Sequence, residues 1–203
     1  MFSGIIQAVG AIEKVEPLAA GVRLTIDAAG LDLGDAKVGD SIAVNGACMT
    51  ATSIAVGRFT VDVSRESLDV TAGLGAPGPV NLEKAMVLGD RIDGHLVTGH
   101  VDGIGEVTAF EQQGESWRLE VRTPRELARF IARKGSITID GVSLTVNSVQ
   151  DEPAGTRFEV NLIPHTLQVT TLARLKPAAR VNLEIDLVAR YMQRLLESAS
   201  SGQ

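Results

Sequence analysis

The sequence predicts an all-β protein with two similar six-stranded antiparallel β-barrels and a C-terminal α-helix. Three observations support this fold class. The chain repeats itself once, short segments alternate apolar and polar residues, and turn-forming residues separate these segments. Among its 203 residues are 21 glycines and only 3% aromatic residues, a composition that suits many short strands joined by tight turns.

The internal repeat pairs segments that lie about 95 to 101 residues apart. The matching pairs are residues 2–12 with 97–107, 45–46 with 140–141, and 80–83 with 181–184. The last pair, Val-Asn-Leu-Glu, is identical in both copies. Two copies of so long a unit are too few for a solenoid. We therefore expect two equivalent domains, residues 1–94 and residues 95–186.

Each repeat should contain about six strands that close into a small barrel, because closure removes exposed strand edges. In the first repeat we expect strands over residues 2–15, 22–28, 41–44, 48–54, 58–63 and 80–83, with a surface turn over 73–79. In the second repeat we expect a restart at 97–107, then 117–122, the hairpin 137–146, 158–162 and 181–184. Residues 124–133 have helical spacing with proline in the first turn.

Residues 186–198 are predicted to form a helix with one apolar face. Leu187, Val188, Tyr191 and Leu195 recur every three or four positions along it. No such segment follows the first repeat. We therefore expect residues 187–203, the helix and tail, to mediate self-association; packing on its own barrel is the alternative.

Composition excludes several classes of function. The net charge of −6 and pI of about 5.1 argue against a nucleic-acid surface, which needs a basic patch. No apolar run approaches a membrane span, and no secretory leader follows Met1, so a cytoplasmic protein is expected. The single cysteine, Cys48, cannot form an intramolecular disulfide, and the spacing of His95, His100 and His165 fits no zinc pattern.

Chemistry is expected where the two copies differ. Cys48 aligns with Ser143, Ile5 with His100, Phe2 with Val97, Ala85 with Asp186, and Glu66 with His165. Shared glycines and hydroxyls beside turns could bind a planar polar ligand, or could simply form turns. A lone cysteine is usually a packing residue, and a histidine can be a general base or a structural group. The residues alone thus predict a duplicated barrel that binds small polar ligands.

Several motifs resemble the riboflavin synthase α-chain family over residues 1 to about 195. They lie at residues 1–6, 45–50, 94–102, 134–135, 139–146, 162–167 and 181–186. The resemblance implies two Greek-key barrels, a homotrimer joined by the C-terminal helices, and a site between the N-barrel of one subunit and the C-barrel of its neighbour. It implies dismutation of two molecules of 6,7-dimethyl-8-ribityllumazine into riboflavin and 5-amino-6-ribitylaminouracil by four-carbon-unit transfer, without cofactor or metal. A lumazine synthase is a further expected partner.

The resemblance also implies site residues. The catalytic candidates are Ser41, Cys48, His100, Ser143, Thr145 and Asp186. Cys48 would assist proton transfer or nucleophilic attack on the N-barrel side, His100 would work with Ser143 and Thr145 on the C-barrel side, and Asp186 would orient groups across the seam. Phe2 would cover the ring system as an aromatic lid.

Ligand contacts are implied in both repeats. In the first they are Phe2, Gly4, Ile5, Ile6, Cys48, Met49, Thr50, Asp62, Val63, Ser64, Arg65, Glu66 and Ser67. In the second they are Gly99, His100, Val101, Lys134, Ser143, Leu144, Thr145, Leu162, Ile163, Pro164, His165, Thr166 and Leu167. Two positions depart from the family pattern: Ala47 replaces a cysteine found in some members, and His165 replaces an acid.

The main alternative is a relative that carries lumazine or flavin without turnover. Retention of Cys48, His100, Ser143 and Asp186 together favours the enzyme. A structural trimer with an incidental pocket is a third reading.

Overall fold

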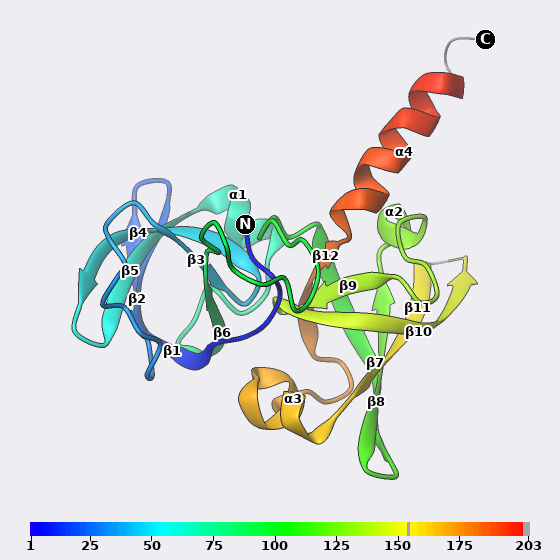
Figure 1. The fold of residues 1–203 in the computed structure, drawn as a ribbon, viewed down its shortest axis with the longest axis horizontal. Coiled ribbons are helices and arrows are strands. Elements are labelled where there is room, and N and C mark those ends of the chain that lie inside the picture. The colour runs from blue at the N-terminus through cyan, green and yellow to red at the C-terminus, as the bar shows by residue number, and fades with distance from the viewer. Residues whose placement is uncertain (154, 201–203) are drawn as a thin grey trace.

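Two closed β-barrels lie side by side, and a C-terminal helix extends away from the second (Figure 1). This computed structural model describes residues 1–153 and 155–200. Each barrel has six antiparallel strands, so the predicted duplicated all-β fold with a terminal helix is confirmed.

The two barrels share one strand order. The first contains β1 (Ala8–Leu18), β2 (Gly21–Asp27), β3 (Ser41–Val44), β4 (Ala47–Ala55), β5 (Arg58–Ser64) and β6 (Gly78–Lys84). The second contains β7 (Gly103–Gln113), β8 (Ser116–Thr123), β9 (Ser136–Ile139), β10 (Val142–Glu152), β11 (Gly155–Leu162) and β12 (Arg180–Ile185). The order β1-β2-β5-β4-β3-β6 recurs as β7-β8-β11-β10-β9-β12, and in both the long connection that sets the second strand beside the fifth gives a Greek key.

Irregularities in the strands are duplicated as well. The register shifts between Ile12 and Lys14 in β1 and again between Val107 and Ala109 in β7. A second pair of shifts lies in β4 and β10. β-Bulges bend a strand and increase its twist, which a closed six-stranded barrel requires at its corners.

Short helical segments and one longer terminal helix complete the fold. These are α1 (Arg65–Val70), α2 (Arg125–Ala128), α3 (Pro164–Val169), the 3-10 turn η1 (Thr171–Arg174) and α4 (Leu187–Ser200). The helix expected over residues 124–133 is thus wrong in length. After Ala128 the hydrogen bonding is of the 3-10 type, because the amides of Phe130 and Ile131 donate to carbonyls three residues back instead of four.

Two further expectations are corrected at the start of the chain and before β6. The first strand begins at Ala8, not at residue 2, because residues 2–6 leave the first barrel as an arm. The expected surface turn over 73–79 contains Leu74, which is buried in the core of the first barrel, and β6 already starts at Gly78.

The lumen of each barrel is filled with apolar side chains. Leu24, Phe59 and Val61 lie in the first core, and Leu119 and Phe158 lie in the second, all almost fully buried. Because strand residues alternate sides, the neighbouring polar residues face outward. A ligand must therefore bind on the outer faces of the barrels.

The two repeats exchange their leading segments. Residues 2–6, the first arm, and residues 97–101, the second arm, meet as Phe2 and Val97 exchange two backbone hydrogen bonds of 2.8 and 3.0 Å. Ile6 then packs against the core of the second barrel, and Val101 against the core of the first. Each arm thus completes the barrel of the other repeat.

The barrels also meet through their equivalent hairpins. Gly46 and Gly141 face each other so closely that a Cβ at Gly46 would lie 2.7 Å from the Gly141 nitrogen. Asn81 Nδ2 donates to the Asp140 carbonyl at 2.9 Å, and Asn182 Nδ2 donates to the Asn45 carbonyl at 3.0 Å. The contact is therefore nearly two-fold symmetric.

One substitution breaks this symmetry. Asn45 Oδ1 accepts from the Asn81 amide at 2.8 Å, and Asp140 Oδ1 accepts from the Asn182 amide at the same distance. The second repeat therefore places a carboxyl where the first has an amide. Burial raises the pKa of Asp140 from its ordinary 3.8 to about 7.

Replacing Asp140 with asparagine should remove a pH-dependent loss of stability. Between pH 4 and 7 the folded protein holds a proton on Asp140 that the unfolded chain has released, so the free energy of unfolding falls as pH rises, by up to about 1.4 kcal/mol per pH unit. In urea unfolding experiments from pH 4 to 8, the free energy of unfolding of Asp140→Asn should rise relative to that of the wild type as the pH approaches 8.

The first repeat offers the matched control for this experiment. Asn45→Asp should make the free energy of unfolding fall further as pH rises, because it buries a second carboxyl at the equivalent position. Parallel stability curves for the wild type and Asp140→Asn over this pH range would contradict the assignment.

Candidate functional site

The outer faces of β3 and β4 carry the polar candidates of the first barrel. Ser41 pairs with Thr50 and Ala43 with Cys48 across these strands, so their side chains share one side. The intervening residues Ile42 and Met49 point into the core. In the second barrel the same register places Ser143 opposite Thr138 and Thr145 opposite Ser136.

The second arm lies directly over Cys48. The Cys48 amide donates to the Gly99 carbonyl at 2.7 Å. A Cβ at Gly99 would lie 2.6 Å from the Cys48 Cβ, and Gly99 has a φ of +79°, so only glycine fits here. This contact sets the arm against the outer face of the first barrel.

A buried glutamate holds the arm in place. Glu184 of β12 accepts hydrogen bonds from the Thr98 amide and hydroxyl, both at 2.7 Å, and from the Gly99 amide at 2.9 Å. Burial raises the pKa of Glu184, and these donors oppose that shift. The second arm is thus fixed to the second barrel at one end while it covers the first.

Cys48 and His100 line one small cavity where the arm crosses. It has a volume of about 170 Å³, and its walls come from β4, the end of α1 and the second arm. The lining residues are Ala47, Cys48, Met49, Ser67, Val70, Thr71, Gly99, His100 and Val101. Cys48 is half-buried and His100 is exposed, so both can reach a ligand. We call this the Cys48 site.

The first arm makes the equivalent contact on the second barrel. The Ser143 amide donates to the Gly4 carbonyl at 2.8 Å. Glu83 accepts from the Ser3 amide at 2.7 Å, from the Ser3 hydroxyl at 2.8 Å and from the Gly4 amide at 3.0 Å. Ile5 is exposed beside this contact, at the position that His100 takes in the Cys48 site. We call this the Ser143 site.

His95 supplies an imidazole to the Ser143 site. Its Nδ1 shares a 2.7 Å hydrogen bond with the Ser143 hydroxyl, and its Nε2 is buried without a hydrogen-bond partner in the part of the chain that the structure describes. Burial lowers the pKa of His95, and the nearby charge of Asp186 opposes that shift. A neutral imidazole therefore lies against a serine hydroxyl, with a carboxylate near.

Sequence reasoning considered His95 only as a metal ligand and missed this role. The comparison between repeats could not reveal it, because His95 aligns with a position before Met1. The grouping of His100 with Ser143 and Thr145 is also corrected. Since the arms cross between barrels, His100 lies with Cys48, and Ser143 is joined by His95 instead.

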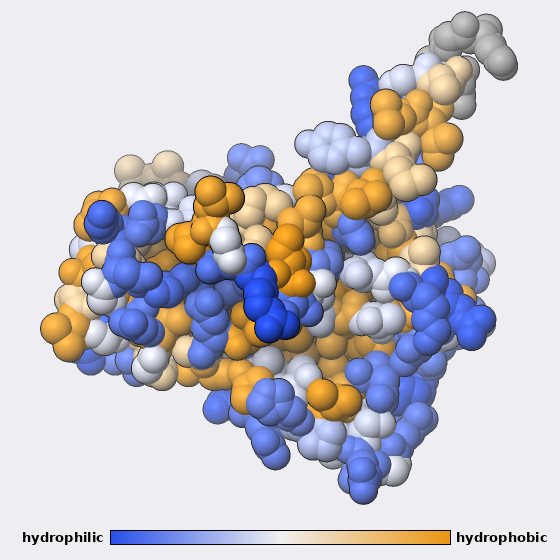
Figure 2. Space-filling model, viewed as in Figure 1, coloured by the Kyte–Doolittle hydropathy of each residue, from blue (hydrophilic) through white to orange (hydrophobic). Residues whose placement is uncertain are grey.

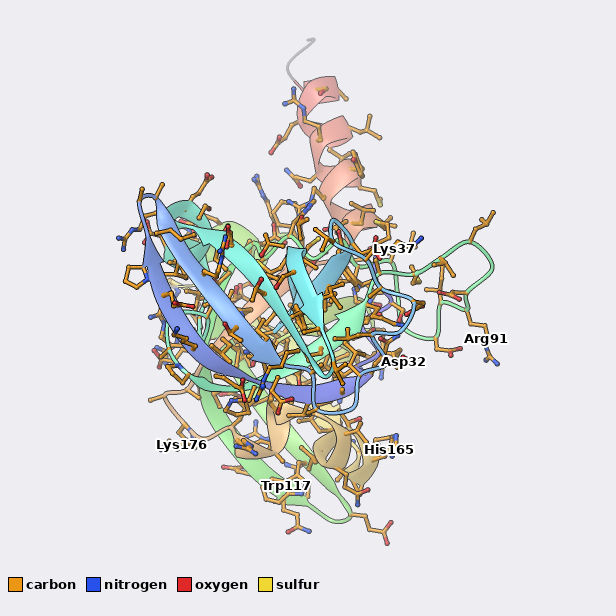
Figure 3. The ribbon with its side chains drawn as sticks, turned by 90° about the vertical axis from the view of Figure 1, so that its left-hand side faces the viewer. Asp32, Lys37, Arg91, Trp117, His165 and Lys176 are labelled. Carbon is orange, nitrogen blue, oxygen red and sulfur yellow. The ribbon has the colours of Figure 1, made fainter. Side chains whose placement is uncertain are left out.

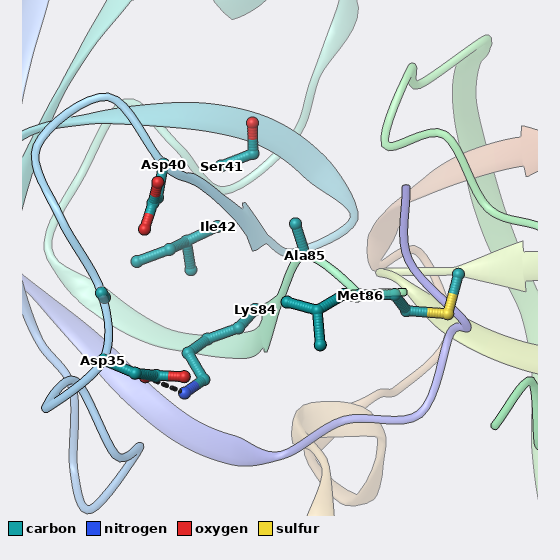
Figure 4. Close-up of a pocket in the computed structure, with 9 residues that line it drawn as sticks. Asp35, Asp40, Ser41, Ile42, Lys84, Ala85 and Met86 are labelled. Carbon is teal, nitrogen blue, oxygen red and sulfur yellow. Dashed lines mark hydrogen bonds and ion pairs between the residues drawn. The ribbon is translucent and has the colours of Figure 1, made fainter. Parts of the chain in front are cut away.

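Ser41 lines a separate cavity of about 250 Å³ between the loop before β3 and the end of β6 (Figure 4). Asp35 and Lys84 form an ion pair at its edge. The remaining wall includes Asp40, Ile42 and Met86. Ser41 and Cys48 thus face the same side of the sheet but line different hollows.

Some implied contact residues are buried or already paired with another side chain. Val63 and Leu162 are almost fully buried in the two cores. Phe2 is also fully buried, packed with Ala43 and Val97, so the lid role would require its ring to leave this cluster. Asp62 is held by Arg23 through two hydrogen bonds of 2.7 and 2.9 Å.

The other candidates lie on short helices, on the surface or against the second core. Ser64 caps α1, and Thr166 lies in α3; the exposed residues are Thr50, Thr145, Arg65, Glu66, Lys134, Ile163, Pro164 and His165. His165 lies on the surface at the start of α3 (Figure 3). Ile6, Leu144 and Leu167 pack against the second core.

Within residues 1–153 and 155–200, no cluster of His, Cys, Asp and Glu could hold a metal ion. In the same ranges, no helix is long and apolar enough to cross a membrane.

The sequence model of the lumazine-binding domain matches the chain twice, over residues 3–85 and 98–186. A riboflavin synthase from Mycobacterium tuberculosis (strain CDC 1551 / Oshkosh) is 45% identical over 204 residues, which cover 98% of this chain and 100% of that protein. The chain belongs to the riboflavin synthase family. The resemblance seen in the motifs, and the expectation of an enzyme, are therefore confirmed.

Another synthase and solved structures of LumP also match this chain over most of its length. The riboflavin synthase of Photobacterium phosphoreum is 41% identical and covers 97% of this chain and 89% of its own. The crystal structure of LumP complexed with riboflavin superposes with a TM-score of 0.79 at 25% identity, over 91% of this chain and 99% of that one. LumP complexed with 6,7-dimethyl-8-(1'-D-ribityl) lumazine has a TM-score of 0.77 at 23% identity.

Displacing the second arm should expose Cys48. In Gly99→Ala the new methyl group clashes with the Cys48 Cβ, so the arm must lift from the barrel. Alkylation of Cys48 by iodoacetamide, followed by mass spectrometry, should be several-fold faster than in the wild type. Cys48 is the only cysteine, so the signal is unambiguous.

Gly114→Ala is the matched control. Gly114 also has positive φ, at +62°, but a Cβ there meets no atom within 4 Å. It should react at the wild-type rate, while far-UV circular dichroism checks that both variants are folded. An unchanged rate in folded Gly99→Ala would contradict the covering role of the arm.

Proposed function

We propose that this protein is a riboflavin synthase that converts two molecules of 6,7-dimethyl-8-ribityllumazine into riboflavin and 5-amino-6-ribitylaminouracil. The observation that carries the proposal is the pair of equivalent sites on one chain that differ in their reactive side chains. A dismutation needs two identical substrates to be treated differently. Similarity to synthases over nearly the whole chain supports the same reaction.

The two lumazines undergo different steps in this reaction. One must lose a proton from its acidic exocyclic methyl group, and the other must be activated by a nucleophile or water. Hydrogen-bond donors must stabilise the delocalised anion. The two sites offer Cys48 with His100 and Ser143 with His95, so each provides a nucleophile and an imidazole.

The Ser143 site is suited to accept a proton. Burial lowers the pKa of His95, which favours the neutral imidazole, the form that can accept a proton. We propose that the methyl proton passes to the Ser143 oxygen as the Ser143 hydroxyl passes its own proton to His95 Nδ1, and that Asp186 stabilises the imidazolium that forms. Thr145 lies two residues along the same outward face of β10 and would donate to the bound ligand.

The Cys48 site is suited to attack or proton donation. Cys48 and His100 line one cavity, and Ser67 lies in its wall. We propose that Cys48 or a water held by His100 activates the ring of the second lumazine. Ser41, in the neighbouring hollow, would bind a more distant part of the same substrate.

A carrier of lumazine or flavin is the competing function. The fold does not separate the two, because LumP superposes on most of this chain. The side chains favour the enzyme, since Cys48, His100, Ser143 and Asp186 are all present and lie at the two sites. Identity to the synthases, at 41–45%, also exceeds the 25% identity to LumP.

We also propose that further copies of the chain cover α4 and form the expected homotrimer. Val188, Tyr191, Met192 and Leu195 form one apolar stripe on this helix, each 58–70% exposed (Figure 2). So exposed an apolar stripe is typical of an interface between subunits. In such an assembly the Cys48 site of one subunit would face the Ser143 site of a neighbour, so that two bound lumazines meet.

Three expectations remain proposals. These are the division into domains at residues 1–94, 95–186 and 187–203, the cytoplasmic location, and association with a lumazine synthase.

Incubating the purified protein with 6,7-dimethyl-8-ribityllumazine alone tests the function. Riboflavin absorbance should increase without any added cofactor, with one riboflavin formed for every two lumazines consumed. Stoichiometric binding without riboflavin formation would identify a carrier instead. No change in ligand fluorescence would indicate a structural protein.

Cys48→Ala separates chemistry from binding in this assay. It should lower kcat by about 10- to 1000-fold while changing lumazine affinity far less, as expected for a group that acts in the transition state. Equal losses in both quantities would assign Cys48 to packing.

Deleting residues 187–203 should yield a smaller species with little activity, because the proposed site requires two subunits. Light scattering measures the mass, and the riboflavin assay measures the activity. Leu195→Glu offers a milder test, since it places a charge in the apolar stripe of an otherwise complete helix. A fully active monomer in either case would refute the inter-subunit site.

A further inference from the structure

Asp102 joins the second arm, β12 and α4 through one carboxylate. Its Oδ2 accepts from the Ile185 amide at 2.9 Å, and both of its oxygens accept from Arg190 Nη2, at 2.7 and 2.9 Å. Its own amide donates to the Leu183 carbonyl at 2.8 Å. The Asp102 side chain is only 11% exposed, whereas that of Arg190 is 41% exposed, so solvent reaches the ion pair from the arginine side.

The first repeat shows what this position does without a helix. Gln7 is the residue equivalent to Asp102, and its Oε1 accepts from the Lys84 amide at 2.9 Å, the counterpart of the Ile185 bond. Both repeats therefore use a side-chain oxygen to close the last strand of the barrel. Only the second repeat uses a carboxylate, and only the second repeat has an arginine on a following helix to bind it.

The same carboxylate lies between residues of both sites. His100 precedes Asp102 by two residues on the second arm and lines the Cys48 site. Asp186 directly follows Ile185 and lies near His95 of the Ser143 site. Asp186 also begins α4, because its Oδ1 accepts from the Val188 amide at 2.8 Å.

A second contact fixes the direction of α4 further from the barrel. Arg129 Nη1 donates to Glu197 Oε1 at 3.0 Å, so the outer half of the helix is tied to the segment after α2. The polar side of α4 therefore faces its own barrel, and the apolar stripe is left for another subunit.

We infer that Asp102, through Arg190, is a positioning residue that sets His100 and Asp186 relative to α4, and so couples subunit assembly to the geometry of both sites. The inference rests on the proposed function. Without the ion pair, Asp102 would still close β12 as Gln7 closes β6, but α4 could turn relative to the second arm. A displacement of about 1 Å at a reacting group can lower kcat by about 100-fold.

Asp102→Asn, Arg190→Gln and the double variant test the inference. Asparagine keeps an acceptor for the Ile185 amide, as Gln7 does for Lys84, and removes only the charge. Each single variant should lower kcat by about 10- to 100-fold. The double variant should have the same kcat as the less active single variant, because the two residues act as a unit. Activity is measured at protein concentrations where light scattering shows full assembly.

Assembly and positioning give different results in this experiment. If kcat returns to the wild-type value once the variants are fully assembled, the ion pair serves assembly alone and the inference is overturned. Unchanged kcat, or losses that add in the double variant, overturn it as well. Arg194→Gln, which removes a charge one turn later on the same helix, should retain wild-type kcat.

The wild-type protein separates this inference from the proposed function. If it forms no riboflavin, the proposed function fails, and the same variants are then compared by fluorescence titration with riboflavin. A shared weakening of riboflavin binding in both single variants, absent from Arg194→Gln, supports the positioning role. Equal binding by all variants overturns it.

Discussion

The crossing of the two arms is the constraint on which the rest of the structure depends. Each arm is bound at one end by a buried glutamate of its own barrel, Glu83 or Glu184, and covers the outer face of the other barrel. The glutamates each accept three hydrogen bonds from backbone and hydroxyl donors, which offsets the desolvation of the carboxylates. Because the lumens are filled, ligand sites form on the outer faces of the barrels, and the Cys48 and Ser143 sites lie where an arm crosses a barrel.

The crossed arms also explain how similar repeats acquire different chemistry. One arm carries His100 to Cys48, and the other carries Ile5 to Ser143. The second site gains its imidazole from the linker, where His95 bonds the Ser143 hydroxyl. The two sites are therefore unequal because their imidazoles come from different segments, the second arm and the linker before it.

Much of the fold follows from local sequence patterns, and the site follows only in part. The strand alternation, the Asn45-Gly46 and Asp140-Gly141 turns and the repeat itself predicted both barrels. The sequence could not reveal that residues 2–6 leave their barrel, because Ile6 is apolar and fits either core. This is also why His100 was grouped with Ser143: in a simple tandem arrangement it would belong to the second barrel. His95 had no counterpart in the repeat, so no difference marked it.

The symmetric contact between Gly46 and Gly141 indicates how the duplicated chain arose. Each glycine meets its own equivalent, Phe2 meets Val97, and Asn81 and Asn182 bond reciprocally across the barrels. A surface patch that contacts a copy of itself is the defining property of an isologous dimer. The single chain thus has the geometry of a two-fold dimer whose halves became covalently joined. Fusion released each half from the need to stay identical, and the exchange of Asn45 for Asp140, or of Gln7 for Asp102, became possible on one side only.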